Sequence, residues 1–293
     1  MLESPSHIFG ALYQCEASLL DAGDRNRYIS ALVQLSFVIP TRNQAQFLRQ
    51  CIDGCLAQRI PDSEVLVVDG ASTDDTREVL ASYGDCVRWI SEPDRGQSDA
   101  INKAIRLARG EVVAWINSDD YYAGPGVISR LLGEFARDER CDIVYGDGVR
   151  VDVEGHELGP YRSRPIERVA TIVTHPASFV LQPTLLFRRA LFVDVGGVDE
   201  ALHYTMDYEL WIRMFAAARA TRYVPEMIAC ARYHDSAKSV AAMGKQIREL
   251  YRVKRAHARK LELGPLDRAR MYAGMASLAA YWMAARLGLK RVA

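Results

Sequence analysis

Residues 111–120 read EVVAWINSDD, an apolar run of strand length that ends in polar side chains. The run predicts a buried strand over 111–117. Asp119 and Asp120 would follow its carboxyl end, where two adjacent carboxylates repel each other unless a cation lies between them. Their oxygens suit Mg²⁺ or Mn²⁺ together with a bound diphosphate. The alternative is an ordinary turn after a strand, since Asn, Ser and Asp are common turn residues.

Upstream of this stretch, apolar runs of strand length alternate with amphipathic helical patterns. Strands are predicted over 35–40, 64–70 and 87–90, and helices over 46–58, 76–83 and 98–108. Such alternation is typical of parallel α/β units. We therefore expect an α/β fold with a doubly wound, mostly parallel central sheet, which binds its ligands at the carboxyl ends of the strands.

The second half of the chain is less regular. It predicts a strand over 142–147, strand material within 178–187 and a helix over 206–218. From residue 241 the pattern is helical, and Gly264 and Pro265 break it in two.

Composition and charge narrow the class of protein. The 293 residues carry 37 Lys+Arg and 37 Asp+Glu, so the net charge is zero. This composition excludes wholesale disorder and disfavours a nucleic acid partner. Residues 241–293 nevertheless hold 12 Lys+Arg against 3 Asp+Glu, a net charge of +9, which leaves an acidic remainder. Six cysteines without a CxxC pair, and no secretory signal, favour a cytoplasmic protein with free thiols.

The opening stretch is the last of four motifs that follow one another along the chain. They are VIPTRN at 38–43, VVDGASTDDT at 67–76, EPDRGQSDAINKA at 92–104 and WINSDD at 115–120. Together they resemble glycosyltransferase family 2, over about residues 35–240. The resemblance implies the GT-A fold and an inverting transfer from a nucleotide-diphosphate sugar, with UDP favoured. The implied acceptor is a hydroxyl of a glycan or lipid-linked molecule in surface polysaccharide or O-antigen-type synthesis.

The resemblance also implies site residues. Those expected to bind the nucleotide sugar are Pro40, Thr41, Asn43, Asp69, Arg95, Asp99, Lys103, Asn117 and Ser118. Asn117-Ser118-Asp119 matches the DxD motif of the family, with an amide in place of the first carboxylate. The expected ligands of Mn²⁺ or Mg²⁺ are Asp119, Asp120 and His234, although a surface-loop histidine is the alternative for His234.

The predicted helix over 206–218 resembles the family segment that carries the catalytic base. Inversion requires a base to take the acceptor proton as the new bond forms, and Asp207 stands at the matching position. Capping of the helix N-terminus is the alternative for Asp207. Glu209 is the second candidate base, but two residues further on it would point to a different helix face.

These expectations define the domain organisation: an N-terminal extension over 1–33, a catalytic domain over 34–240 and a basic amphipathic helical tail over 241–293. The catalytic domain would comprise a nucleotide-binding half (34–120) and an acceptor half (121–240). For the tail, docking on the inner face of an anionic membrane competes with packing on the body or on a second subunit.

Two other functions compete with glycosyl transfer. A sugar-phosphate nucleotidyltransferase would carry a glycine-rich loop after the first strand, where residues 40–43 read PTRN. A non-catalytic nucleotide-sugar-binding scaffold protein would have lost Asp207 and the metal carboxylates, and this chain retains them.

Overall fold

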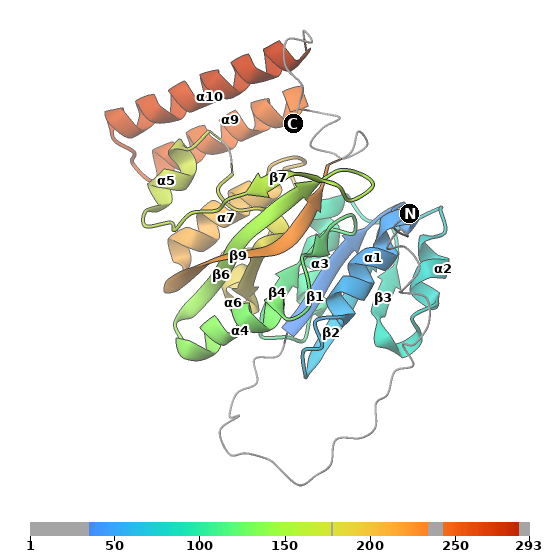
Figure 1. Cartoon of the computed structure of the whole chain (residues 1–293). Helices are drawn as coiled ribbons and strands as arrows, with labels where there is room; N and C mark the ends of the chain where they lie inside the picture. The colour runs from blue at the N-terminus through green and yellow to red at the C-terminus, as the bar shows by residue number, and fades with distance from the viewer. Residues whose placement is uncertain (1–34, 177, 234–242, 287–293) are drawn as a thin grey trace, which may run out of the picture. The chain divides into compact units, whose positions relative to one another are not determined.

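The computed structural model describes residues 35–176, 178–233 and 243–286, without the side chains of residues 243, 282, 285 and 286. The predicted extension over 1–33 and the predicted metal ligand His234 lie outside these residues. The described strands form one sheet in the order β3-β2-β1-β4-β8-β6-β9-β5, with β7 beside β6 (Figure 1).

The first half of the sheet is parallel. Its strands are β1 (Leu35–Thr41), β2 (Ser63–Asp69), β3 (Arg88–Ser91) and β4 (Val112–Trp115). The helices that follow β1, β2 and β3 are α1 (Ala45–Leu56), α2 (Thr76–Ala81) and α3 (Gln97–Leu107). β1 pairs with both β2 and β4, and β3 extends the sheet beyond β2. All predicted elements of this half are therefore present, with their ends shifted by a few residues.

The second half adds antiparallel pairing. Its strands are β5 (Tyr121–Tyr122), β6 (Cys141–Val151), β7 (Glu157–Tyr161), β8 (Leu185–Arg188) and β9 (Ala220–Arg232). β8 lies antiparallel between β4 and β6, whereas β9 runs parallel to β6. The prediction missed β9 and extended the strand over 178–187 too far, because residues 178–184 form a loop and a short 3₁₀ helix, η3 (Gln182–Thr184). The predicted α/β class is confirmed.

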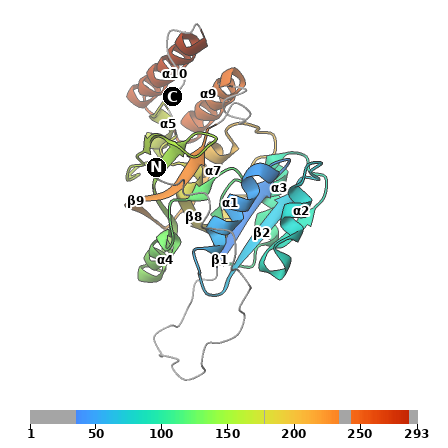
Figure 2. The same cartoon turned by 45° about the vertical axis from the view of Figure 1, so that its right-hand side comes forward.

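Alternation along the strands sends side chains into two cores, one on each face of the sheet. The remaining helices of this part are α4 (Val127–Arg137), α5 (Val169–Thr174), α6 (Arg189–Asp194) and α7 (Met206–Ala217). Phe37 and Ile39 share a core with α1 and α4, while Val38 and Trp115 share a core with α3 and α7. Figures 1 and 2 show these helices beside the sheet. β1 and β4 are thus covered on both faces, which fixes the position of their carboxyl ends.

The C-terminal part forms two helices, α9 (Met243–Lys260) and α10 (Pro265–Arg286), which lie side by side next to α5 (Figures 1 and 2). The predicted break at Gly264 and Pro265 is where α10 begins. Leu250 and Val253 of α9, and Met271 of α10, are buried in the core that also holds the apolar side chains of α7. One side of this hairpin therefore packs on the body.

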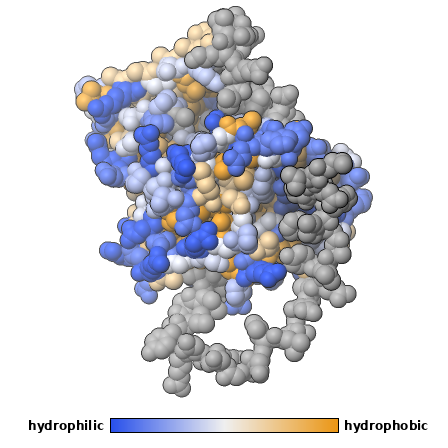
Figure 3. All heavy atoms as spheres, in the orientation of Figure 1, coloured by the Kyte–Doolittle hydropathy of each residue, from blue (hydrophilic) through white to orange (hydrophobic). Residues whose placement is uncertain are grey.

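The other side of the hairpin is exposed. Its large exposed apolar side chains are Tyr251, Leu266, Tyr272 and Met283, and Figure 3 shows the hydrophobic surface along α10. A surface cleft between the two helices is lined by Arg255, Arg259 and Arg268 with the two tyrosines. No helix among the described residues is both long and apolar enough to cross a bilayer. Contact of this face with a membrane surface or a second subunit stays a prediction.

A half-buried carboxylate, that of Glu209, joins α7 to α9. Glu209 Oε2 lies 2.6 Å from Arg213 Nη2, and its Oε1 lies 3.0 Å from His257 Nε2 on α9. Burial by itself would raise the pKa of Glu209, but the hydrogen bonds from His257 and Arg213 outweigh it and lower the pKa to about 2.

Acid should therefore weaken this junction. Because the pKa of Glu209 is lower in the folded than in the unfolded chain, its stabilisation is present above about pH 4.5 and is lost as the pH falls toward 2. We expect Glu209→Gln to cost on the order of 2–3 kcal/mol at pH 7 and much less at pH 3, as measured by urea unfolding. A cost that does not change between these pH values would contradict the prediction.

Candidate active site

A cavity of about 550 Å³ opens at the carboxyl ends of β1 and β4. Its lining comes from segments far apart in the chain. They include Pro40–Arg42 and Gln44, Asp94, Gly96 and Gln97, Asn117–Asp120, Ser178 and Val180–Pro183, His203–Tyr208, Ala231–Tyr233, and Gln246 and Leu250 of α9. A site at the strand ends follows the rule for open α/β sheets and agrees with the prediction from sequence.

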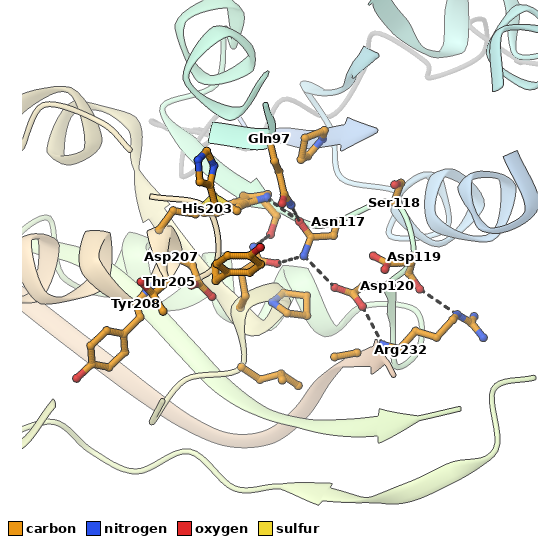
Figure 4. Close-up of a pocket in the computed structure, with 18 of the residues that line it drawn as sticks. Gln97, Asn117, Ser118, Asp119, Asp120, His203, Thr205, Asp207, Tyr208 and Arg232 are labelled. Atoms are coloured by element: carbon orange, nitrogen blue, oxygen red, sulfur yellow. Dashed lines mark hydrogen bonds between the residues drawn. The ribbon is translucent and has the colours of Figure 1, made fainter. Parts of the chain in front are cut away.

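Asn117 lies at the centre of a network of amide and carboxylate groups (Figure 4). Its Oδ1 accepts hydrogen bonds from Gln97 Nε2 (3.1 Å) and Trp115 Nε1 (3.3 Å). Its Nδ2 donates to Gln182 Oε1 (3.1 Å) and Asp120 Oδ2 (3.5 Å). Since the indole N–H of Trp115 can only donate, the orientation of the Asn117 amide is determined. Both amide atoms are therefore occupied by protein partners, and Asn117 shapes the floor of the cavity.

Asp120 is buried beneath this floor. Its Oδ1 accepts the backbone N–H of Arg232 at 2.9 Å, which ties the segment after β4 to the end of β9 (Figure 4). Burial, and next the negative charge of Asp119, raise the pKa of Asp120 well above its ordinary value. Arg232 also donates through Nε to the carbonyl of Asp119 at 3.0 Å.

The carboxylates of Asp119 and Asp120 fit a divalent cation. Both line the cavity, and a cation beside them would offset the repulsion that raises the pKa of Asp120. Two hard carboxylate donors are the ligand type that Mn²⁺ and Mg²⁺ prefer. Among the described residues, another acidic group with metal-ligand spacing, Asp152, Glu154 and His156, is partly or fully exposed near the β6–β7 turn and does not line the cavity.

Asp207 stands in the first turn of α7 and lines the same cavity (Figure 4). The N-cap of α7 is Thr205, so Asp207 is not the capping residue. The backbone N–H of Tyr208 donates to Asp207 Oδ1 at 2.7 Å. Glu209, the second candidate base, is absent from the lining and is held by Arg213 and His257, as expected for a different helix face.

The predicted nucleotide-binding residues divide into two groups. Pro40, Thr41, Asn117 and Ser118 line the cavity. Asn43 and Asp69 instead hold the loops after β1 and β2. Asn43 Oδ1 accepts the N–H of Thr73 at 2.8 Å, and Asp69 Oδ2 accepts the hydroxyl of Ser91 at 2.6 Å.

Three further charged residues of the predicted set, Arg95, Asp99 and Lys103, also lie outside the lining. Arg95 pairs with Asp99 at 3.0 Å and with Glu200 at 2.7 Å, and Lys103 pairs with Glu92 at 2.6 Å. A hydrogen bond from the backbone N–H of Arg95 is the main reason that the pKa of Asp99 is lowered. The roles predicted for these residues in binding the diphosphate stay predictions.

Other lining residues were not foreseen as parts of the site. Arg42, Asp94 and Gln97 sit within the recognised motifs, whose spacing could have suggested them. Arg232 and Gln246 carry no local signal, because only the packing of β9 and α9 brings them to the strand ends of the first half.

Comparison with known proteins agrees with this geometry. Residues 36–196 match the family model described as glycosyl transferase family 2. The chain belongs to glycosyltransferase family 2. An uncharacterized glycosyltransferase of Rickettsia typhi is 31% identical over 216 residues, which cover 71% of this chain and 67% of that protein. The chondroitin synthase of Escherichia coli is 29% identical over 61% of this chain, but the match spans only 26% of that synthase.

Solved structures share the fold of this family 2 chain. Staphylococcus aureus TarS 1–349 in complex with UDP aligns with a TM-score of 0.57 and 19% identity, over 75% of this chain and 65% of that one. The mannosyltransferase PcManGT from Pyrobaculum calidifontis, in complex with GDP-Man and Mn²⁺, aligns with a TM-score of 0.55 and 19% identity, over 88% of this chain and 81% of that one. The predicted GT-A fold is confirmed.

The network around Asn117 predicts the effect of restoring a carboxylate there. Asn117→Asp removes the donor to Asp120 and Gln182 and adds a third negative charge beside Asp119, so it should lower stability in EDTA by about 1–3 kcal/mol. Mn²⁺ should raise the melting temperature of this variant more than that of the wild type. Asn43→Asp is the control, because the Asn43 side chain acts as an acceptor and keeps that role. Equal melting temperatures of Asn117→Asp and wild type in EDTA would contradict the prediction.

Proposed function

We propose that this family 2 chain is an inverting glycosyltransferase that moves a sugar from a nucleotide-diphosphate donor, with UDP favoured, to an acceptor hydroxyl. The observation that carries the proposal is the presence of Asp207 and the pair Asp119–Asp120 in one cavity. Direct inversion at an anomeric carbon requires a base for the acceptor proton, and a pair of carboxylates could hold a cation that neutralises the leaving diphosphate.

Asp207 would take the proton of the acceptor hydroxyl while the acceptor oxygen bonds to the anomeric carbon. The bond from that carbon to the diphosphate breaks in the same step, and the nucleoside diphosphate leaves with the electron pair. Mn²⁺ or Mg²⁺ held by Asp119 and Asp120 would supply positive charge for the leaving diphosphate. Pro40 and Thr41, at the carboxyl end of β1, would border the nucleoside.

The relatives support polymer or surface-glycan synthesis as the setting. The E. coli chondroitin synthase and a Pasteurella multocida hyaluronan synthase both match this chain over more than three-fifths of its length. A glycan or lipid-linked acceptor is therefore the proposed partner. The competing nucleotidyltransferase has no support in the loop after β1, which lacks glycine, and a non-catalytic scaffold protein has no need of Asp207 in the cavity.

The role of Asp207 predicts a specific loss. Asp207→Asn keeps the shape of the side chain but removes the base, so turnover should fall by about 10²-fold or more while the affinity for UDP stays nearly unchanged. Glu262→Gln, which neutralises an exposed glutamate outside the cavity, is the control. Sugar transfer is measured with a panel of acceptors, and UDP affinity by calorimetry. Near-normal turnover by Asp207→Asn would exclude it as the base.

The donor and the metal are tested together by thermal shift. A ligand that binds only the folded state raises the melting temperature, so with Mn²⁺ we expect UDP-sugars to produce a larger shift than GDP- or dTDP-sugars. Asp119→Ala should reduce the Mn²⁺-dependent part of this shift. An equal shift in EDTA and in Mn²⁺ would contradict the metal assignment. A larger shift with a GDP-sugar would contradict the preference for a uridine nucleotide as the donor.

A further inference from the structure

A carboxylate from another helix binds the segment that leads into α7. Thr205 is the N-cap of α7, yet its side chain makes no capping hydrogen bond within the helix. Glu249 of α9 accepts hydrogen bonds from Thr205 and from the two residues before it. Its Oε1 accepts the backbone N–H groups of Tyr204 (2.7 Å) and Thr205 (2.8 Å) and the Thr205 hydroxyl (2.9 Å). The N–H of His203 lies 3.1 Å from Oε2.

This arrangement is electrostatically favourable. The N-terminus of a helix carries partial positive charge, so a carboxylate beside it is stabilised. The N–H groups of residues 203–205, just before α7, all donate to this carboxylate. Burial alone would raise the pKa of Glu249, but the hydrogen bonds from residues 203–205 outweigh it and lower the pKa. Glu249 is therefore ionised at neutral pH and holds three consecutive backbone groups in one conformation.

The segment that Glu249 holds is a wall of the active-site cavity. Residues 203–208 all line it, and Asp207 follows Thr205 by two residues (Figure 4). The course of the backbone at 203–205 therefore determines where the Asp207 side chain points. Gln246 and Leu250, on either side of Glu249 along α9, line the cavity directly.

α9 is itself fixed to the body beyond Glu249. Lys254, which is fully buried, donates from Nζ to the carbonyls of Val173 (3.3 Å) and His175 at the end of α5. One turn further on, His257 bonds to Glu209 of α7. These anchors hold α9 at two further points, so that Glu249 meets the start of α7 from a rigid support.

We propose that Glu249 is a positioning residue that orients Asp207 in the cavity. Through this residue, α9 contributes to the geometry of the active site. The inference rests on the proposed role of Asp207 as the base. Removing the Glu249 carboxylate should therefore slow the chemical step without weakening donor binding. The expected donor contacts at Pro40, Thr41 and Asp119 come from β1 and from the segment after β4, and Glu249 touches neither.

The test compares Glu249→Gln with Glu262→Gln, a neutralised exposed glutamate just after α9. Glutamine keeps one acceptor but turns an NH₂ group toward N–H donors, so the 203–205 segment should shift. We expect kcat to fall about 10- to 100-fold in Glu249→Gln, with donor KM and UDP affinity within about twofold of wild type. Glu262→Gln should match the wild type. A kcat within twofold of wild type in Glu249→Gln, or an equal loss of UDP affinity, would overturn the proposal.

A second pair of variants tests the same contact if Glu249→Gln does not fold. Thr205→Ala loses the hydroxyl that donates to Glu249, whereas Thr205→Ser keeps it. We expect a several-fold lower kcat only in Thr205→Ala, and equal kcat values in the two variants would overturn the proposal.

Asp207→Asn, measured in parallel, separates this inference from the proposed function. Substantial turnover by Asp207→Asn would overturn both the assignment of Asp207 as the base and the positioning role of Glu249. An inactive Asp207→Asn beside fully active Glu249→Gln and Thr205→Ala would leave the proposed function standing and overturn the positioning role alone.

Discussion

The buried carboxylate of Asp120 is the constraint on which the site depends. A carboxyl group buried beneath the floor of a cavity must be hydrogen-bonded, and here the partners are the backbone N–H of Arg232 and the amide of Asn117. The bond from Arg232 joins the segment after β4 to the end of β9, and thus the two halves of the sheet. The guanidinium of Arg232 strengthens the joint, since it also lies over the rings of Phe47 and Tyr121. Asp119, which is half-buried, lines the cavity beside this fixed carboxyl group.

The C-terminal helices have two faces with different environments. The inner face of α9 carries Glu249, Lys254 and His257, which bond to α7 and to the end of α5. The outer face carries arginines and exposed tyrosines. The basic side chains of the described part of this region therefore fall into two sets. Lys254 is buried and bonds to the end of α5, whereas Arg255, Arg259 and Arg268 line a cleft on the surface. Packing on the body, one of the alternatives raised for this region, accounts for the inner face alone.

Local patterns predicted the parallel half of the sheet because each strand there is a buried apolar run followed by an amphipathic helix. They failed for β9, whose first residues are only partly buried and read ATRYVPEM, without a continuous apolar run. The roles of Arg95 and Lys103 beside the diphosphate rest on charge and motif alone and stay predictions. In the structure these side chains pair with Glu200 and Glu92, carboxylates that no local pattern links to them.

The sequence by itself determined the family, the α/β class and the edge of the sheet where Asp119 and Asp120 lie, since strand periodicity and motif order are local properties. Only the tertiary structure decided that Asn117 is bound by Gln182, and that Asp207 shares a cavity with Asp119. It alone showed that Glu249, on a helix from the basic C-terminal region, binds the segment that leads into α7. Such contacts join residues that are dozens of positions apart, and contacts over such separations produce no periodic pattern in a sequence.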